Sequence, residues 1–483
     1  MTARCVMVLG TTSGAGKSWL ATALCRWYAR QGLKVAPFKA QNMSNNARVV
    51  EGGEIGSAQY FQALAARARP DVRMNPLLLK PENDTHSQVV LLGQVSEELS
   101  RMPWRGRGAS VWPVIAQSLD ALRAENDVVV IEGAGSPAEI NLKDCDIVNM
   151  KVARHANAQC LLVTDIDRGG AFAHLYGTWA LLDEDERKLI RGFVLNKFRG
   201  DASLLAPAPQ MLRDLTGIPT VATLPMWWHH GLPEEDGIPL LLPPDTHLQP
   251  TTRIAIVAYP RISNHDEFQP LANIPNVQLI FARTPADLHL AEWIVLPGSK
   301  HTSSDLAWLR AQGLDRAIAQ HAAAGGRVLG VCGGLQMLGE ALIDTEGIDG
   351  NGPGLGLLPL VTVFEPNKTV RATTATFGQM HGLWAALSGV TADGYEIHHG
   401  RTAQHPGMPR GREAIPGGLA WQSEAGNVLG VYLHGLFEDS RVLHALFGAR
   451  ARTLDEVFDG LADFIDRHFE HGVLTHLSGG GTR

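Results

Sequence analysis

One cysteine in the second half of the chain lies in a glycine-rich setting suited to nucleophilic chemistry. Cys332 follows the apolar run from 327 to 331 and precedes Gly333 and Gly334. A tight turn from strand to helix would expose this thiol, because the glycines avoid clashes and the helix N-terminus favours the thiolate. We predict that Cys332 is a nucleophile, with backbone N–H groups of Gly298 and Gly333 stabilising the oxyanion that it forms.

The base expected to activate this thiol is His434, which follows the late apolar strand from 428 to 433. Cysteine and histidine partners meet in space, so their separation in sequence is no objection. A buried cysteine and a lone histidine are more often structural, but the glycine turn and the strand-end position favour catalysis. The sequence leaves open which acid orients His434: Glu438, Glu396, or none, as in a dyad.

A second glycine-rich loop, near the start of the chain, has the residue types that grip a triphosphate. The loop from Gly10 to Ser18 follows a predicted strand and opens a predicted helix, which argues against an incidental glycine-rich turn. Lys17 would place its charge between the β- and γ-phosphates, and Ser18 would ligate Mg²⁺. The other predicted ATP contacts are loop residues whose backbone N–H groups would point at phosphate oxygens, namely Thr12, Ser13, Gly14 and Gly16.

Polar residues follow three further predicted strands, at the edge where ligands bind in open α/β sheets. Glu132 would bind Mg²⁺ directly or through water, or else cap the next helix. Asn196 is the candidate for adenine recognition, against the alternative of a turn residue. Asp165 and Asp167 end a third strand, and substrate binding and loop shaping both remain open for them.

Composition argues against several classes of protein. A length of 483 residues favours two domains. A net charge of -7, without any Lys/Arg-rich stripe, argues against a nucleic-acid partner. The five cysteines are widely spaced and form no C-x-x-C pair, which argues against disulfides and zinc and favours a reducing cytoplasm. No signal-peptide pattern or membrane-length apolar run is found, so we predict a cytoplasmic protein without a membrane partner.

Strand-type apolar runs alternate with helical patterns in both halves, which predicts two mostly parallel sheets covered by helices. The predicted strands are 5–10, 34–38, 127–131, 159–164, 192–195 and 220–224 in the first half, and 253–258, 293–296, 327–331 and 428–433 in the second. The predicted parts are an ATP-binding domain of residues 1–230, a proline-rich linker of 231–251, a domain of 252–445 that contains Cys332 and His434, and a helical tail of 446–483. The tail has apolar residues at helical spacing and is expected to pack on the second domain.

The two glycine-rich motifs each resemble a known family. The phosphate loop has Thr11 where the first glycine is usual and Gly10 one residue early, a spacing that resembles dethiobiotin synthetase and its relatives. The pattern G-x-C-x-G-x-Q, which ends at Gln336, resembles class I, triad-type glutamine amidotransferases, where this glutamine helps to hold substrate glutamine. The usual glutamate two residues after the histidine is replaced here by Leu436. The resemblances imply two three-layer α/β domains, a dethiobiotin-synthetase-like P-loop sheet and a flavodoxin-like amidotransferase sheet.

Over nearly its full length the chain resembles the cobyric acid synthase family, on segments 39–46, 56–59, 74–81 and 164–170 beyond the generic motifs. The resemblance implies ATP- and glutamine-dependent amidation of the b, d, e and g carboxylates of adenosylcobyrinic acid a,c-diamide. It also implies Mg²⁺, small-molecule substrates and no tightly bound organic cofactor. The amide-rich run would let Gln41, Asn42, Asn45 and Asn46 hydrogen-bond the corrinoid arms, unless it is only a polar loop.

Two other functions are compatible with parts of the sequence. A sister amidoligase, acting on cell-wall lipid or on the a and c carboxylates of cobyrinic acid, would share both halves. A partition-type ATPase carrying an inactive glutaminase-like module would use the first half for regulated binding. The presence of both Cys332 and His434 argues against an inactive module.

Overall fold

The computed structural model describes residues 2–82, 85–233, 252–405, 407–408, 411–448 and 452–479. The chain falls into two compact units. Unit 1 consists of Met1–Ser44, Val50–Leu232 and Leu454–Arg483, and unit 2 consists of Asn45–Val49 and Pro233–Thr453. Most of the predicted linker, residues 234–251, lies outside the described residues. Among the described residues, no helix is both long and apolar enough to cross a membrane.

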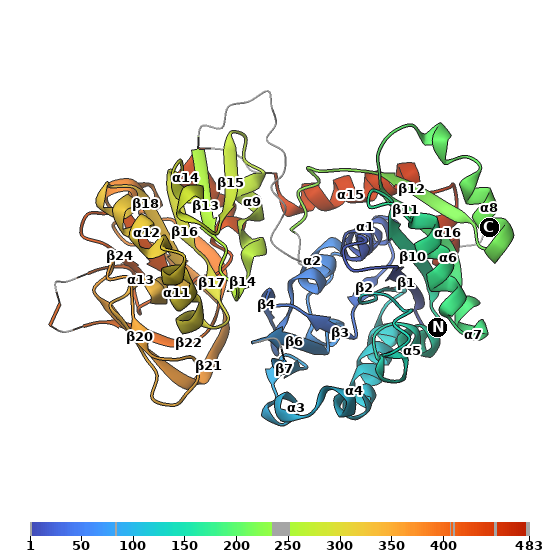
Figure 1. The fold of residues 1–483 in the computed structure, drawn as a ribbon, viewed down its shortest axis with the longest axis horizontal. Coiled ribbons are helices and arrows are strands. Elements are labelled where there is room, and N and C mark those ends of the chain that lie inside the picture. Colours follow the sequence, from blue (N-terminus) through green and yellow to red (C-terminus); the bar gives the residue numbers. More distant parts are fainter. Residues whose placement is uncertain are drawn as a thin grey trace. The chain divides into compact units, whose positions relative to one another are not determined.

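A six-stranded parallel sheet forms the centre of unit 1 (Figure 1). All six strands predicted for the first half are present, and every hydrogen-bonded pair is parallel. Their near-continuous apolar character follows from burial on both faces of the sheet. In order across the sheet the strands are β12 (Thr220–Pro225), β11 (Ile190–Phe198), β10 (Gln159–Asp165), β1 (Arg4–Gly10), β9 (Val128–Glu132) and β2 (Val35–Phe38).

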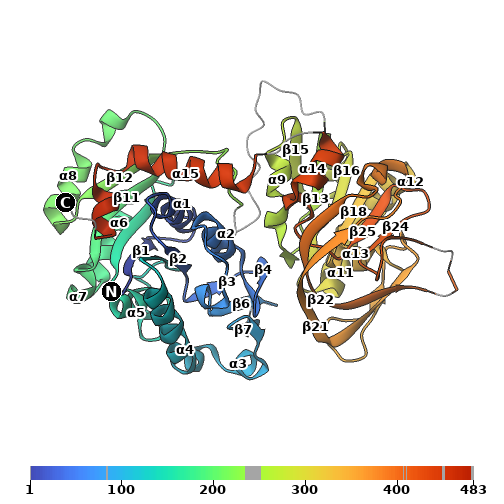
Figure 2. The same ribbon diagram turned by 180° about the vertical axis from the view of Figure 1, so that it is seen from behind.

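Alternating side chains of these strands pack into two apolar layers, one on each face of the sheet. The helices that cover the two faces can be followed in Figures 1 and 2. Val6 and Val8 of β1 pack in the layer of α1 (Lys17–Arg30), α2 (Ser57–Ala65) and α15 (Leu454–His468). Met7 and Leu9 pack in the other layer, which contains α4 (Trp104–Glu125), α5 (Met150–Ala156), α6 (Ala171–Leu181) and α8 (Ala208–Thr216). The shorter helices of unit 1 are α3 (Glu97–Arg101), α7 (Glu184–Arg187) and α16 (Val473–Leu477).

The expectation that the C-terminal tail packs on the second domain was wrong. Residues from Leu454 onward belong to unit 1, where the apolar stripe of α15 packs against α1. Polar contacts fix the same pairing: Trp27 Nε1 donates to Asp466 at 2.8 Å, and the Tyr28 hydroxyl donates to the Leu474 carbonyl at 2.9 Å. The spacing of apolar residues predicted the helix correctly, but an apolar stripe alone does not specify its partner.

A seven-stranded sheet forms the centre of unit 2. The four strands predicted for the second half are present in its parallel part, which makes this unit a second α/β sheet. Across the sheet the order is β15 (Val277–Ala282), β13 (Thr252–Val257), β16 (Trp293–Leu296), β18 (Arg327–Val331), β25 (Val428–Val431), β24 (Ala420–Gln422) and β23 (Arg412–Ile415). Its helices are α9 (Gln269–Ala272), α10 (Pro285–Leu288), α11 (Thr302–Ala311), α12 (Leu314–Ala323), α13 (Gly333–Leu338) and α14 (Ser440–Phe447).

Several antiparallel elements were not predicted. In unit 2 the long strands β21 (Leu360–Thr376) and β22 (Thr391–Gln404) pair with each other. Many of their side chains are polar and exposed, so they lack the apolar runs that identify buried strands. Unit 1 has a small mixed sheet of β3 (Gln41–Met43), β6 (Leu77–Pro81), β7 (Ser87–Leu91) and β8 (Gln94–Val95), in which only the β3–β6 pair is parallel; its strands are too short for a clear pattern.

The packing of α15 against α1 leads to a prediction about the stability of unit 1. Replacing the fully buried Leu461 with alanine should lower the free energy of unfolding of unit 1 by about 2–5 kcal/mol, because a cavity remains. Hydrogen exchange measured by mass spectrometry should then show faster exchange in α1 and unchanged exchange in residues 252–448. The matched control is Leu215→Ala on α8, where the leucine is 65% exposed and the loss should stay below about 0.5 kcal/mol. Faster exchange in unit 2 alone would contradict the docking.

Candidate active sites

Cys332 lies at a strained turn between β18 and α13. Its φ of 52° is in the left-handed region, where a residue with a Cβ atom is disfavoured and needs support from its surroundings. Close packing provides that support, because an added Cβ at Gly330 would lie 2.6 Å from the Gly334 carbonyl. The thiol is 5% exposed and its Sγ lies 3.5 Å from the Ile397 carbonyl oxygen. This is the strand-to-helix turn that the glycine pattern predicted, and the role of its thiol as a nucleophile stays a prediction.

His434 lies beside Cys332 and is held by a carboxylate. The Cys332 sulfur lies close enough to His434 to raise the pKa of its ring, and His434 Nδ1 lies 2.9 Å from Glu267 Oε1. The other oxygen, Glu267 Oε2, accepts from the Gly435 backbone N–H at 2.7 Å. Both His434 and Glu267 are 1% exposed, so the carboxylate fixes the ring within the protein interior. Cysteine, histidine and glutamate thus form one connected set.

The charge state of His434 follows from this setting. Burial alone lowers the pKa of His434, but the Glu267 carboxylate and the Cys332 sulfur outweigh it and raise the pKa to about 10. The ring is therefore protonated at neutral pH. A buried imidazolium stabilises a neighbouring thiolate and can donate a proton to a leaving amine.

Glu267 is the acid that the sequence left open. The two candidates from the sequence have other partners: Glu438 Oε1 lies 2.6 Å from Arg48, and Glu396 Oε2 lies 3.2 Å from His398. Glu267 is on a short 3-10 helix, η4 (His265–Phe268), which comes after the first strand of unit 2. Its position shortly after a predicted strand could have marked Glu267 as a candidate acid. The spacing of histidine and acid that is usual in the family pointed to residues after His434 instead.

The predicted oxyanion glycines lie close to this set. An added Cβ at Gly333 would lie 2.8 Å from the Ser299 backbone nitrogen, and one at Gly298 would lie 2.9 Å from His434 Cε1. The turns that contain Gly298 and Gly333 therefore converge next to the nucleophile. The role of their N–H groups in stabilising an oxyanion stays a prediction.

Gln336 is buried in α13, and both ends of its amide have protein partners. Its Oε1 accepts from the Thr302 hydroxyl at 2.9 Å, and its Nε2 donates to the Tyr432 hydroxyl at 3.2 Å. An added Cβ at Gly400 would collide with this amide. Thr302, Gly400 and Tyr432 thus fix the side chain one helical turn from Cys332.

In unit 1 the phosphate loop connects β1 to α1, as predicted. Gly14 and Gly16 have φ values of 71° and 99°, which only glycine adopts without strain. An added Cβ at Gly10 would lie 2.9 Å from Lys17 Nζ, so the early glycine lets the lysine fold back over the loop. Lys17 Nζ donates to the carbonyls of Thr12 at 3.0 Å and Gly135 at 3.2 Å. The longer loop therefore still places an ammonium at its centre.

Glu132 organises the other side of the loop. Its Oε1 accepts from Ser18 Oγ at 2.7 Å and Lys39 Nζ at 2.8 Å, and its Oε2 accepts from Gln62 Nε2 at 2.6 Å. Burial would raise the pKa of Glu132, but Lys39 and the hydrogen bonds from Ser18 and Gln62 lower it, so it is a carboxylate. With its proton donated to Glu132, the Ser18 oxygen keeps its lone pairs for a hard cation.

Asn196 and Asp165 support the loop from the opposite side. Asn196 Nδ2 donates to the Ala15 carbonyl at 2.9 Å, and its Oδ1 accepts from the Lys197 backbone N–H at 2.9 Å. Lys197 Nζ bonds both the Gly14 carbonyl at 2.8 Å and Asp165 Oδ2 at 3.1 Å. In this arrangement Asn196 holds the loop, and its recognition of adenine stays a prediction. Asp165 is bonded as a loop-shaping residue would be.

The remaining predicted substrate residues are divided between the units. Gln41 and Asn42 belong to unit 1, and Asn45 and Asn46 belong to unit 2. Asn42 Nδ2 donates to Gln59 Oε1 at 3.1 Å. Asp167 pairs with Arg199 and lies farther out, with its side chain 29% exposed. The amide-rich run is thus more than a surface loop, because Asn42 and Asn46 are both buried.

Lys39, Gln59 and Gln62 were missed as site residues. Gln59 Nε2 lies 3.5 Å from Glu132 Oε2, and the three side chains together surround this carboxylate. Lys39 and Gln59 occur in the segments that carry the family resemblance, but sequence spacing does not show that they meet at Glu132. Gln62 is one helical turn beyond Gln59 on α2, which is a signal for a shared face.

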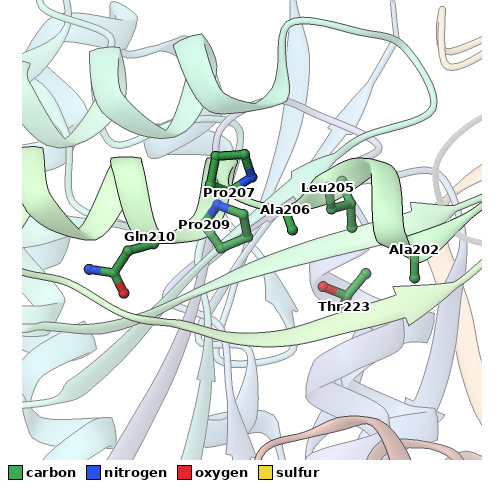
Figure 3. A pocket seen from close by; sticks show the side chains of 7 residues that line it. All are labelled: Ala202, Leu205, Ala206, Pro207, Pro209, Gln210 and Thr223. Carbon is green, nitrogen blue, oxygen red and sulfur yellow. The ribbon is translucent and has the colours of Figure 1, made fainter.

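A separate cavity of about 430 Å³ lies in unit 1 beside α8 (Figure 3). It is lined by Ala202, Leu205, Ala206, Pro207, Pro209, Gln210 and Thr223. These side chains are mostly apolar and lack ionisable groups. None of them is a residue predicted to bind ATP or substrate.

Comparison with known proteins finds relatives of both units. The family described as "CobQ/CobB/MinD/ParA nucleotide binding domain" matches residues 6–232, and the "CobB/CobQ-like glutamine amidotransferase domain" matches residues 253–442. The cobyric acid synthase of Variovorax paradoxus (strain S110) is 77% identical over 99% of this chain and 100% of its own length. That of Polaromonas sp. (strain JS666 / ATCC BAA-500) is 72% identical, covering 98% of each chain. That of Acidovorax ebreus (strain TPSY) is 73% identical, covering 99% of this chain and 100% of its own.

The Glu267–His434 contact predicts a titration shift. In Glu267→Gln, the pKa of His434 should fall well below 10, because burial remains while the carboxylate charge is lost. In the unaltered protein the raised pKa of His434 adds to the free energy of unfolding. This contribution is fully present below the unfolded-state pKa of about 6.5, and it is lost as the pH rises through 10. NMR titration of ¹³C-labelled histidine rings measures the shift, with His434→Gln identifying the signal.

The control for this titration is Glu396→Gln, since that carboxylate contacts His398. It should leave the His434 titration in place. An unchanged His434 pKa in Glu267→Gln, or an equal shift in the control, would show that Glu267 does not set the charge of the ring.

Proposed function

The chain belongs to the cobyric acid synthase family, and we propose that its two sites act together to amidate carboxylate arms of a corrinoid. It is a glutamine-hydrolysing, ATP-dependent amidoligase. The finer proposal is that it amidates the b, d, e and g carboxylates of adenosylcobyrinic acid a,c-diamide. The observation that carries the proposal is a connected, buried set of Cys332, His434 and Glu267 in a chain that also has a phosphate loop.

In the proposed glutaminase step, the Cys332 sulfur attacks the side-chain carboxamide carbon of glutamine. A C–S bond forms, and the carbonyl oxygen becomes an oxyanion that the N–H groups of Gly333 and Gly298 stabilise. His434 gives its proton to the nitrogen, the C–N bond breaks, and ammonia leaves a thioester behind. Water then hydrolyses the thioester to glutamate, with His434 as the base and Glu267 holding its ring. Gln336 is proposed to help hold the substrate glutamine.

In the proposed synthetase step, a corrinoid carboxylate becomes reactive by phosphorylation. A carboxylate oxygen attacks the γ-phosphorus of ATP, which gives an acyl phosphate and ADP. Ammonia then attacks the acyl carbon, and phosphate leaves with the electrons of the broken C–O bond. Each amide therefore consumes one ATP and one glutamine. Lys17 offsets the charge on the transferring phosphoryl group, from its place at the centre of the loop.

The residues around the loop fit a triphosphate with Mg²⁺. The proposed ATP contacts are the side chains of Lys17 and Ser18, with backbone N–H groups of the loop and Asn196 toward the base. Ser18 would ligate the cation, and Glu132 would act on it through the Ser18 hydrogen bond or through water. When bound, Mg²⁺ supplies charge neutralisation at the phosphate oxygens. The other loop contacts are Thr12, Ser13, Gly14 and Gly16.

The proposed corrinoid contacts that belong to unit 1 lie on both sides of the loop. Asn42 connects through Gln59 to Glu132, so an arm held by Asn42 would lie on the Glu132 side. Asp165 and Asp167 are on the other side, next to Lys197 and Arg199. Gln41, Asn45 and Asn46 complete the proposed set of amide and acid groups. Amides both donate and accept hydrogen bonds, which suits carboxylate and acetamide arms alike.

The other functions considered are not favoured. Relatives that are 65–77% identical over nearly the whole chain are named cobyric acid synthase, which speaks against the sister amidoligases. A connected Cys332, His434 and Glu267 speaks against an inactive glutaminase module. All five cysteines are free thiols, which supports the cytoplasm as the proposed compartment.

The decisive experiment follows product masses. With ATP, Mg²⁺, glutamine and adenosylcobyrinic acid a,c-diamide, mass spectrometry should show successive amidation up to four added amides. Cys332→Ala should lose glutamine-dependent amidation, because the nucleophile is gone, and should keep amidation with added ammonia. Cys145→Ala, which changes a half-buried cysteine in unit 1, is the control and should retain both activities. Glutamine use by Cys332→Ala would reject the nucleophile, and an unchanged corrinoid with the intact protein would reject the substrate.

A second prediction separates the two sites. Lys17→Met should reduce ATP-dependent amidation by about two orders of magnitude or more with either nitrogen donor, because one charge that stabilises the transferring phosphoryl group is lost. Glutamine hydrolysis measured without ATP should persist, since unit 2 is unaltered. Lys188→Met, on an exposed lysine paired with Glu184, is the control and should retain amidation. Coupled assays measure the release of ADP and of glutamate. Retained ADP release in Lys17→Met would contradict the role assigned to Lys17.

A further inference from the structure

An arginine from the first fifth of the chain is buried beside the proposed glutaminase residues. The five residues Asn45–Val49 belong to unit 2, although the chain on both sides of them belongs to unit 1. Arg48, in this segment, is 1% exposed. A fully buried guanidinium is costly unless paired, so its surroundings show what holds it there.

Arg48 pairs with two acids next to the set that acts on glutamine. Its Nη2 lies 2.8 Å from Asp266 Oδ2 and 2.6 Å from Glu438 Oε1. Asp266 directly precedes Glu267 on η4. Glu438 is the last residue of the short helix η6 (Leu436–Glu438), which begins two residues after His434. The arginine therefore joins the element that carries the orienting acid to the element that follows the base.

Two further contacts lead from the same segment to His434. The Arg48 guanidinium lies 5.3 Å from the centre of the Tyr395 ring, and this ring stacks on His434 with 5.3 Å between ring centres and 18° between planes. Tyr395 and His434 also exchange backbone hydrogen bonds of 3.2 and 2.9 Å. In addition, the Ala47 N–H donates at 2.9 Å to the side chain of Asn264, the N-cap residue directly before η4.

We propose that Arg48 is a positioning residue for the glutaminase, which holds Glu267 and His434 in their working arrangement by neutralising Asp266 and Glu438. This inference rests on the proposed function of the Cys332 site. Through Arg48, glutamine hydrolysis depends on a segment that directly continues Gln41–Ser44 of unit 1, where corrinoid contacts are proposed.

The charge balance of the cluster explains the dependence. Negative charge comes from the buried Asp266 and Glu267 and from the partly buried Glu438. The compensating cations are Arg48 and protonated His434, and Tyr395 is neutral. Without Arg48 the carboxylates repel one another, and proton uptake by this group becomes easier. A protonated Glu267 no longer holds the imidazolium, so activity should be lost at a higher pH on the acid side than in the unaltered protein.

The test is the pH profile of glutamine hydrolysis by the full chain. Arg48→Met should lower kcat by about tenfold or more, change KM little, and move the acid limb of the kcat profile to higher pH. Arg48→Lys keeps the charge, so its acid limb should stay in place. The double variant Arg48→Met/Glu438→Gln removes the surplus negative charge and should bring the limb back toward its original position.

The matched control is Arg441→Met, which removes an arginine of unit 2 that pairs with Asp439 and Asp393. It should leave both kcat and the profile unchanged. If Arg48→Met unfolds, the test still compares Arg48→Lys, which keeps the positive charge, with Arg48→Met/Glu438→Gln, which removes one positive and one negative charge. The inference is wrong if Arg48→Met leaves the acid limb of the kcat profile in place. It is also wrong if Arg48→Lys and Arg48→Met move that limb equally. Failure of the unaltered protein to hydrolyse glutamine rejects the proposed function instead.

Discussion

Each candidate site is built around one carboxylate that is withdrawn from water, and the surrounding side chains must compensate its charge. Glu132 and Glu267 are each 1% exposed. An unpaired buried carboxylate would take up a proton, so its ionised state requires cations and hydrogen-bond donors. Lys39, Ser18 and Gln62 meet that need for Glu132, and His434 with a backbone N–H meets it for Glu267. The same pairings fix the catalytic groups in space.

The groups that balance the charge of Glu132 and those that balance the charge of Glu267 serve different chemistry. Around Glu132 the compensating cation is Lys39, whose ammonium lies 2.8 Å from the carboxylate, and the carboxylate also accepts a hydrogen bond from the Ser18 hydroxyl and so orients it. Around Glu267 the cation is a histidine with a pKa raised to about 10. Such a ring starts as an acid and becomes a base after giving its proton away, which is the sequence of roles that amide cleavage needs. The choice of partner therefore sets whether a buried acid organises a metal-binding hydroxyl or a proton shuttle.

Sequence analysis predicted the parallel strands of unit 1, the parallel strands of unit 2 except β15, and the two glycine turns, because these features depend on local pattern. Buried strands have continuous apolar runs, and Gly10, Gly14, Gly16 and Gly334 mark positions where the backbone approaches closely or adopts a positive φ. The missed features depend on contacts between distant segments. Glu267 meets His434 across 167 residues, and the helix α15 packs against α1 at the other end of the chain. An apolar stripe or an isolated acid gives no information on such partners.

The placement of Arg48 follows from the same constraint on buried charge. A set of acids crowded beside His434 would be self-destabilising if unit 2 had to neutralise it with residues 252–448 alone, and here the compensating guanidinium comes from near the start of the chain. Removing one partner of a buried ion pair leaves an uncompensated charge, which is more costly than never forming the pair. Arg48, in Asn45–Val49, therefore supplies positive charge to the acids beside His434 in unit 2. A ligase that must not release ammonia without an acceptor gains from this arrangement, because the segment is continuous with residues proposed to hold the acceptor.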